Sequence, residues 1–240
     1  EALQRFSERE HPNQSGRDGG DEEYCENHLR MGGWRSVLVV LMLFAVVCSN
    51  AQKEQSVRYS PDDDGRVYTS LEEALANPSG VYRLKLTKLE ERDSLPAELF
   101  RLTELRELTV KGCRLCIVNA QIRELTHLVY LNLDRNKLLR LPNAIGELQE
   151  LRTLIISRNI LETLPDSISK LHKLDYIDAW DNPLYVLPES ISALEKTLKV
   201  LDLRQIPLSR TEYDAMEALL PNTDILFTDI CECENKRDHD

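Results

Sequence analysis

The sequence predicts an α/β solenoid of about six stacked repeats with a cap at each end. Three observations support this fold class. A leucine-rich pattern recurs at an almost constant spacing, 42% of the 240 residues are hydrophobic, and only 6% are aromatic. A pattern that recurs every ~20–50 residues indicates a solenoid, because one unit cannot bury its apolar face without neighbours. The composition favours a core of aliphatic layers rather than a large aromatic core.

The repeat unit reads L-x-x-L-x-L-x-x-N-x-L-x-x-L-P-x-x-I-x-x-L. Three consecutive copies follow it closely: LVYLNLDRNKLLRLPNAIGEL, LRTLIISRNILETLPDSISKL and LDYIDAWDNPLYVLPESISAL. Two looser copies precede them and a truncated copy follows. The starts are therefore separated by 24, 23, 23, 23 and 24 residues, at Val81, Leu105, Leu128, Leu151, Leu174 and Leu198.

This pattern resembles the leucine-rich-repeat family, in particular the LPxxIxxL class of Ras-suppressor-type scaffolds and many bacterial proteins. The resemblance covers about residues 69–230 and implies a concave parallel sheet with a helical or extended convex side. The residues agree, because the fourth and sixth positions of each copy share one face of a strand. The asparagines in the following turn are expected to satisfy loop backbone groups with their amides; they are Asn136, Asn159 and Asn182.

Pattern and composition divide the chain into seven segments. They are an upstream extension expected to be disordered, a signal peptide, a flexible acidic linker, a cap helix, the repeats, a C-terminal cap and a charged tail. Their predicted bounds are 1–30, 31–51, 52–68, 69–80, 81–210, 211–230 and 231–240. Ser70 is expected to be the N-cap of the first cap helix, with Glu73 completing a capping box. The second cap is expected to hold a helix from about Thr211 to Leu220 and an edge strand after it.

The signal-peptide prediction rests on MGGWRSVLVVLMLFAVVCSNAQ, which begins at Met31. A short start with Arg35 precedes an apolar run from Val37 to Val47, and small residues follow at Ser49 and Ala51. The run is too short for a membrane-spanning helix, which needs ~20 residues. The pattern therefore predicts a secreted or periplasmic protein without a membrane span.

Two other interpretations of this region stay open. If residues 1–30 are a genuine N-terminal segment and not the product of a mis-assigned translation start, the apolar run is an internal anchor. Cys48 is a candidate for lipid attachment, as in bacterial lipoproteins, although Val47 is larger than the residue that usually precedes such a cysteine.

Composition and motifs predict no cofactor, no metal site and no nucleic-acid partner. The formal net charge of −11 argues against nucleic acid as the main partner, because binding its phosphates needs a basic face. The acidic stretch SPDDDGRVYTSLEE fails as a calcium loop, because Ser60 and Leu71 stand where an acidic first residue and a final glutamate are required. A solvated acidic turn is expected there instead.

The cysteines and histidines do not form a catalytic pattern. Cys113 and Cys116 lie four repeats from Cys231 and Cys233, about 19 Å at ~4.8 Å a strand, too far for one zinc ion. Whether Cys231 and Cys233 form disulfides stays open. No serine, aspartate or cysteine is placed to act with His127 or His172, so a non-catalytic protein is predicted.

Strand alternation turns positions three, five and seven of each copy toward the concave face. In copies three to six these positions and the next bring aromatic, aliphatic, acidic and arginine side chains together, which is typical of protein-binding surfaces. The alternative is that strand propensity alone selects these residues. The predicted binding residues are Tyr130, Asp134, Ile155, Arg158, Tyr176, Asp178, Trp180, Asp181, Asp202 and Arg204.

Trp180 is the least regular residue of this set, because it follows Ala179 at a position where the core expects a large aliphatic side chain. Alternation turns Trp180 outward, so it is expected to be partly exposed; the alternative is that the indole leans inward over Ala179.

Two functions follow from the pattern. The first is a secreted or periplasmic protein that binds a protein or peptide, and the second is an intracellular scaffold of the Ras-suppressor type.

Overall fold

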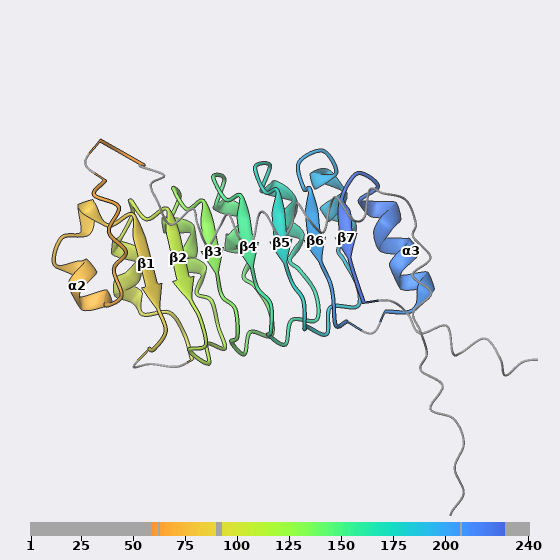
Figure 1. Cartoon of the computed structure of the whole chain (residues 1–240), viewed down its shortest axis with the longest axis horizontal. Helices are drawn as coiled ribbons and strands as arrows, with labels where there is room; N and C mark the ends of the chain where they lie inside the picture. Colours follow the sequence, from red (N-terminus) through yellow and green to blue (C-terminus); the bar gives the residue numbers. More distant parts are fainter. Residues whose placement is uncertain (1–58, 62, 90–92, 207, 229–240) are drawn as a thin grey trace, which may run out of the picture. The chain divides into compact units, whose positions relative to one another are not determined.

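The computed structural model describes residues 59–61, 63–89, 93–206 and 208–228 (Figure 1), so the predictions for 1–51 and 231–240 lie outside the described residues. A single parallel sheet runs through this part of the chain, with seven strands ordered as in the sequence. The strands are β1 Arg83–Leu86, β2 Glu107–Val110, β3 Tyr130–Asn132, β4 Thr153–Ile155, β5 Tyr176–Asp178, β6 Val200–Asp202 and β7 Asp224–Leu226.

Strand register follows the repeat without a slip. Leu108, Leu131, Leu154, Ile177 and Leu201 occupy the fourth position of successive copies, and each is paired with the next across the sheet. All five are fully buried. A shift by one residue would turn this apolar row to solvent, so the hydrophobic pattern fixes the register. The predicted leucine-rich-repeat solenoid is thereby confirmed.

Short 3₁₀ helices cover the other side of the core, behind the sheet in Figure 1. Each follows the extended residue at the proline position of the LP pair and buries an aliphatic side chain toward the sheet. The convex side is therefore helical; a helical or an extended form was expected. The helices are η2 Ala97–Arg101, η3 Ala120–Glu124, η4 Asn143–Glu147, η5 Asp166–Lys170 and η6 Glu189–Leu194.

The turn asparagines join neighbouring repeats. The Nδ2 group of Asn159 donates to the carbonyl oxygens of Ile156 in its own repeat (2.8 Å) and Leu133 in the preceding repeat (3.0 Å). Its Oδ1 atom accepts from the backbone N–H of Leu138, also in the preceding repeat. Asn182 repeats this arrangement one unit later. The side chains are buried, so the expected role of these amides in satisfying loop backbone groups is confirmed.

Two short helices lie in the segment predicted as the N-terminal cap, residues 69–80. Helix α2 covers Leu71–Leu75, and a 3₁₀ turn, η1, covers Pro78–Gly80. Ser70 accepts a hydrogen bond from the backbone N–H of Glu73, as expected for an N-cap. The Glu73 carboxylate instead contacts Arg66, so the structure shows one half of the predicted capping box.

The C-terminal cap contains helix α3, Arg210–Leu219, and the edge strand β7. A complete capping box lies here: Ser209 accepts from the backbone N–H of Glu212, whose carboxylate accepts from the Ser209 N–H. The helix begins one residue before the predicted start at Thr211, and this capping box was not predicted.

The acidic stretch before α2 differs from the expected linker. The Asp63 side chain is buried and holds the guanidinium of Arg83 on β1 through a 2.8 Å ion pair. The same carboxylate accepts from the backbone N–H groups of Tyr59 and Gly65. These hydrogen bonds, with Arg83 first, lower the pKa of Asp63 to about 2. The described residues between 59 and 68 therefore contact β1, and the Arg83 side chain is buried there.

We predict that Asn159→Ala lowers the free energy of unfolding by about 2–4 kcal/mol, because it leaves buried N–H and C=O groups of two repeats without partners. The measurement is chemical denaturation of the full chain. Asn143→Ala is the matched control, because Asn143 is exposed on η4. Equal losses in the two variants would contradict a structural role for the buried amides.

Candidate functional site

The sheet face that points away from the aliphatic core is named the open face. It consists of positions three, five and seven of the repeats, and nine of the ten predicted binding residues lie on it or fold onto its rim. The tenth, Asp181, is exposed in the turn after β5 and makes no side-chain hydrogen bond or ion pair with the described residues.

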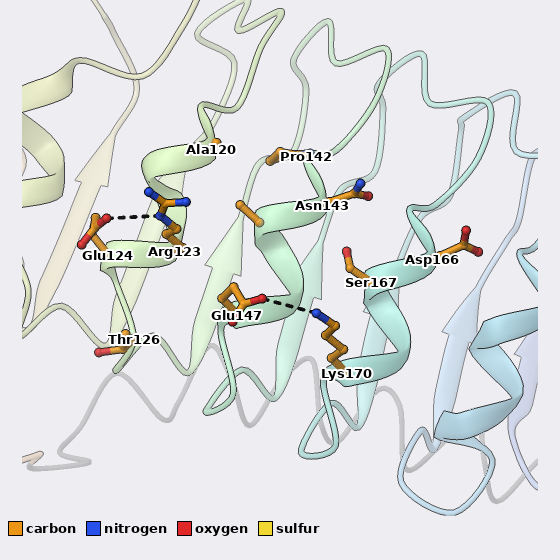
Figure 2. A pocket seen from close by; sticks show the side chains of 11 residues that line it. Ala120, Arg123, Glu124, Thr126, Pro142, Asn143, Glu147, Asp166, Ser167 and Lys170 are labelled. Atoms are coloured by element: carbon orange, nitrogen blue, oxygen red, sulfur yellow. Dashed lines mark hydrogen bonds and ion pairs between the residues drawn. The ribbon is translucent and has the colours of Figure 1, made fainter.

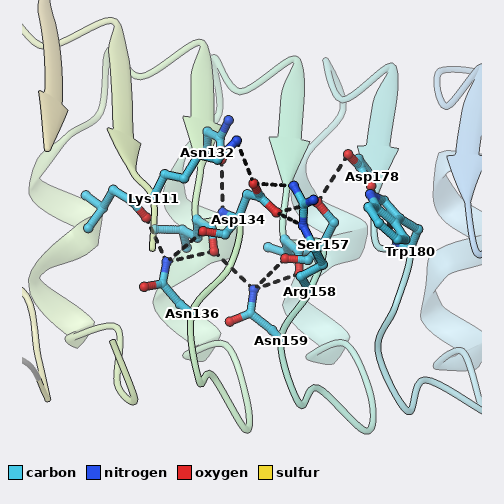
Figure 3. Close-up of polar contacts among 12 residues, drawn as sticks. Lys111, Asn132, Asp134, Asn136, Ser157, Arg158, Asn159, Asp178 and Trp180 are labelled. Atoms are coloured by element: carbon cyan, nitrogen blue, oxygen red, sulfur yellow. Dashed lines mark hydrogen bonds and ion pairs between the residues drawn. The ribbon is translucent and has the colours of Figure 1, made fainter. Parts of the chain in front are cut away.

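Asp134 is the centre of a polar network on the open face (Figure 3). Its carboxylate accepts from Arg158 through both oxygens, at 2.7 Å from Nε and 2.5 Å from Nη2. Lys111 Nζ lies 2.9 Å away and Ser157 Oγ 3.2 Å. The Asp134 side chain is 3% exposed, so its charge is enclosed by these donors. Asp134 was predicted as a binding residue, but in the structure its enclosed carboxylate supports Arg158.

The ionised form of Asp134 is stable despite this enclosure. Burial alone would raise the pKa of the carboxyl, but the hydrogen bonds from Arg158 and Lys111 outweigh burial and hold the pKa below its ordinary value. Lys111 was not among the predicted binding residues. The available signal was its position: Lys111 is the seventh residue of copy two, directly beside the seventh residue of copy three.

Arg158 connects this network to Trp180. Its backbone has φ +54°, a left-handed conformation shared by the equivalent residues Gly112, Arg135, Asp181 and Gln205. From this turn the Arg158 guanidinium lies 4.8 Å from the centre of the Trp180 ring. Trp180 is half-buried, as expected, and the cation holds its ring on one side.

Tyr130 and Tyr176 lie at the opposite end of the strands from Trp180. In the strand register Thr153 lies between Tyr130 and Tyr176. Four residues of extended chain, about 13 Å, separate Tyr176 from Trp180. Burial, followed by the nearby aspartates, raises the pKa of Tyr176 to about 12, so its hydroxyl stays protonated and available as a donor. The aromatic residues therefore border the two ends of the face and do not form one cluster.

Asp178 lies between these aromatic borders, beside Asp202 in the register. Arg204 neutralises Asp202 at 2.6 Å from Nη2. The Asp178 carboxylate accepts only from the Ser157 hydroxyl (3.3 Å) and the Trp180 backbone N–H (3.4 Å), and no cationic side chain of the described residues lies within ion-pair distance. Burial, followed by the charge of Asp202, raises the pKa of Asp178 to about 6.

A second concavity lies on the convex side, among η3, η4 and η5 (Figure 2). It is an open groove with five charged side chains. Arg123 pairs with Glu124 and Lys170 with Glu147, both at 3.4 Å, and Asp166 accepts a hydrogen bond from Ser190 Oγ at 3.1 Å. Asp166, which has no ion pair with a described residue, is exposed to solvent, whereas Asp178 is half-buried, so the open face is the better candidate for a binding site.

The described residues contain no group of metal-binding side chains and no helix long and apolar enough to cross a membrane. Cys113 and Cys116 are free thiols, and burial raises the pKa of Cys113. Cys113 occupies the asparagine position of copy two, where its Sγ donates to the carbonyl of Leu86 at 3.6 Å. This is a structural role.

Comparison with known proteins agrees with the fold. A family model described as a leucine-rich repeat region matches residues 86–221, more than half of the 240 residues. The chain therefore belongs to the leucine-rich-repeat family. Comparison with curated proteins gives no significant match.

Two solved structures show the extent of the structural similarity. A leucine-rich-repeat protein of Leptospira interrogans is 26% identical, with a TM-score of 0.51 over 69% of this chain and 49% of that chain. An internalin of Listeria monocytogenes is 17% identical, with a TM-score of 0.46 over 74% of this chain and 58% of that chain. The chain thus spans about half the length of these proteins.

We predict that Asp178→Asn stabilises the fold by about 1–2 kcal/mol near pH 7.5 and much less near pH 4. The folded pKa of about 6 lies above the ordinary 3.8, so the folded carboxyl keeps a proton that the unfolded chain has released, and stability falls as pH rises between these values. Asparagine keeps the acceptor without the charge.

Denaturant unfolding of both proteins at the two pH values measures this difference. Asp214→Asn is the control, because Asp214 is exposed on α3 and pairs with Arg210 one helical turn away. A stabilisation by Asp178→Asn that is equal at both pH values would show that the charge of Asp178 is not its cause.

Proposed function

We propose that this chain is a non-catalytic binding protein that holds a protein or peptide on the open face of repeats three to six. The observation that carries the proposal is Asp178, a half-buried carboxylate without a cationic partner among the described residues, between Tyr176 and Trp180. A lysine or arginine of a partner would supply the missing cation. The hydroxyl of Tyr176 and the ring of Trp180 would contact the adjoining residues.

The rigidity of the surroundings supports this proposal. Trp180 is held by Arg158, and Arg158 by the enclosed carboxylate of Asp134. Side chains that are already ordered lose little conformational entropy on binding, so more of the contact energy appears as affinity. Aromatic and arginine side chains are also the residues that most often dominate the energy of protein interfaces.

Strand propensity accounts for Tyr130, Ile155 and Tyr176 without any ligand. It does not account for Asp178. Aspartate is unfavourable in strands, and the burial that raises the pKa of this carboxyl lowers the stability of the native fold at neutral pH. Residues that oppose folding in an otherwise regular pattern are expected at functional sites.

The proposed partner is a protein rather than a nucleic acid, because the chain has a net charge of −11. We also propose that the protein is exported, on the sequence pattern of residues 31–51. Mass spectrometry of the native protein tests this: an N-terminus at Gln52 supports export, and an intact segment from Met31 supports the intracellular scaffold. A lipid on Cys48 would support the surface-anchored alternative.

We predict that Trp180→Ala and Tyr176→Ala each weaken binding of the partner at least about tenfold, as expected for residues that dominate an interface. The partner is first isolated from the native setting with the immobilised full chain, and its dissociation constant is then measured by calorimetry. Asp178→Lys is expected to weaken binding further, because it would oppose a basic side chain.

Val67→Ala is the control for this experiment, since Val67 is 48% exposed and lies outside repeats three to six. Its affinity should equal that of the wild type. The proposal is contradicted if Trp180→Ala and Tyr176→Ala bind as tightly as this control.

A further inference from the structure

The carboxylate of Asp178 receives long hydrogen bonds. The Ser157 hydroxyl lies 3.3 Å from its Oδ2 atom, and the Trp180 backbone N–H lies 3.4 Å from its Oδ1 atom. Ordinary lengths are ~2.8 Å for O–H···O and ~2.9 Å for N–H···O. Asp134, by comparison, accepts from Arg158 at 2.5 and 2.7 Å. The charge of Asp178 is therefore poorly stabilised, although its side chain is half-buried.

The Ser157 hydroxyl is shared by two carboxylates (Figure 3). Its Oγ atom lies 3.2 Å from Asp134 Oδ1 and 3.3 Å from Asp178 Oδ2. A hydroxyl carries one proton, so it donates to one of these carboxylates at a time, but its lone pairs also accept. A protonated Asp178 would donate to Ser157 while Ser157 donates to Asp134. The site thus accommodates a proton on Asp178 in its existing hydrogen-bond geometry.

The cations of the open face are engaged by other carboxylates. The ionisable groups that interact with Asp178 or with its aspartate neighbours are Tyr130, Tyr176, Asp134, Asp202, Lys111, Arg158 and Arg204. Burial raises the pKa of both tyrosines, so they stay protonated. Lys111 and Arg158 pair with Asp134, and Arg204 pairs with Asp202. Neutralisation of Asp178 is therefore left to a proton or to a cation from a partner.

We propose that Asp178 exchanges a proton for the partner's cation, so that the open face binds a basic segment at neutral pH and releases it in acid. This inference rests on the proposed function, because it concerns the same face. A bound cation favours the ionised carboxyl, so the proton leaves on binding. A protonated carboxyl offers the cation no counter-charge, so the partner leaves in acid.

The apolar neighbours of Asp178 favour a cation that is carried on an aliphatic stem. Ile155 is its register partner on β4, and Tyr176 and Trp180 are two residues before and after it on the same strand face. Lysine and arginine place methylene groups along apolar surface and keep the charge at the end. A free inorganic cation would leave these apolar surfaces uncovered. The occupant is therefore a lysine or arginine side chain of a peptide or protein.

The direction of the pH dependence follows from the free and bound states of Asp178. In the free protein its pKa is about 6, raised by burial first and by the charge of Asp202 second. A bound cation lowers this pKa. Affinity is therefore highest above ~pH 7 and decreases as the pH falls through the pKa of the free carboxyl.

The experiment begins with a library of random short peptides displayed on phage. The immobilised full chain captures phage at about pH 7.5, and the phage are eluted at about pH 5. Lysine or arginine is expected to be enriched in the eluted peptides. One eluted peptide without histidine, aspartate or glutamate, made with blocked termini, then serves as the probe, because it does not itself titrate in this range.

The probe should bind the wild type about tenfold more weakly at about pH 5 than at about pH 7.5. Calorimetry at about pH 6, in buffers with different enthalpies of ionisation, should show release of about 0.5 proton for each peptide bound. Circular dichroism at each pH checks that the chain stays folded.

Asp178→Asn should weaken binding of the probe at least about tenfold at about pH 7.5 and make the affinity independent of pH. Asp166→Asn is the matched control, because Asp166 is exposed on the convex side and loses the same charge. This control should keep both the affinity and the pH dependence of the wild type.

Asp202→Asn tests the cause of the pH dependence. It removes the neighbouring charge that raises the pKa of Asp178, so the midpoint of the affinity change should move to lower pH. A midpoint that stays unchanged would contradict the part assigned to Asp202.

The inference is overturned if no peptide is retained at about pH 7.5, if the retained peptides lack lysine and arginine, or if Asp178→Asn keeps the wild-type pH dependence. Trp180→Ala and Tyr176→Ala separate this failure from failure of the proposed function. If they weaken binding of a probe whose affinity does not change with pH, the binding face stands and the proton exchange fails. If neither variant weakens binding, the probe does not bind the open face, and both proposals fail.

Discussion

The amide of each turn asparagine bonds to the backbone of its own repeat and of the repeat before it, and the rest of the structure depends on this connection. Asn136, Asn159 and Asn182 are buried and occupy all their hydrogen-bonding groups with loop backbone. A repeat displaced from this register would lose these hydrogen bonds and at the same time expose its row of aliphatic side chains. Both the aliphatic core and the arrangement of side chains on the open face therefore require the repeats to stack in register.

The open face inherits its organisation from the same register. Side chains at one position of neighbouring repeats lie a single strand spacing apart, so Asp134 receives Lys111 from the repeat before it and Arg158 from the repeat after it. Arg158 then orders Trp180 in the next repeat. A chain of contacts thus runs across four repeats and does not include the half-buried carboxylate of Asp178, which has no cationic partner among the described residues.

Most of the fold could be predicted from the sequence because the repeat reports the same local environment six times. The period placed the strands, the buried asparagines and the residues of the open face. The period does not specify how unique side chains pair. Asp134 was expected to contact a ligand, but Arg158, whose backbone is left-handed, places its guanidinium on this carboxylate. The Asp63–Arg83 ion pair joins β1 to a segment outside the repeats, so the repeat pattern could not predict it.

The central claim is that a partner is held on the open face, and site-specific photocrosslinking tests it most directly. A photoreactive residue replaces Thr153, which lies between Tyr130 and Tyr176 in the register, or Asn143, which is exposed on the convex side. The partner is expected to crosslink to the chain modified at position 153 and not to the chain modified at position 143. Crosslinking at position 143 alone would contradict the claim.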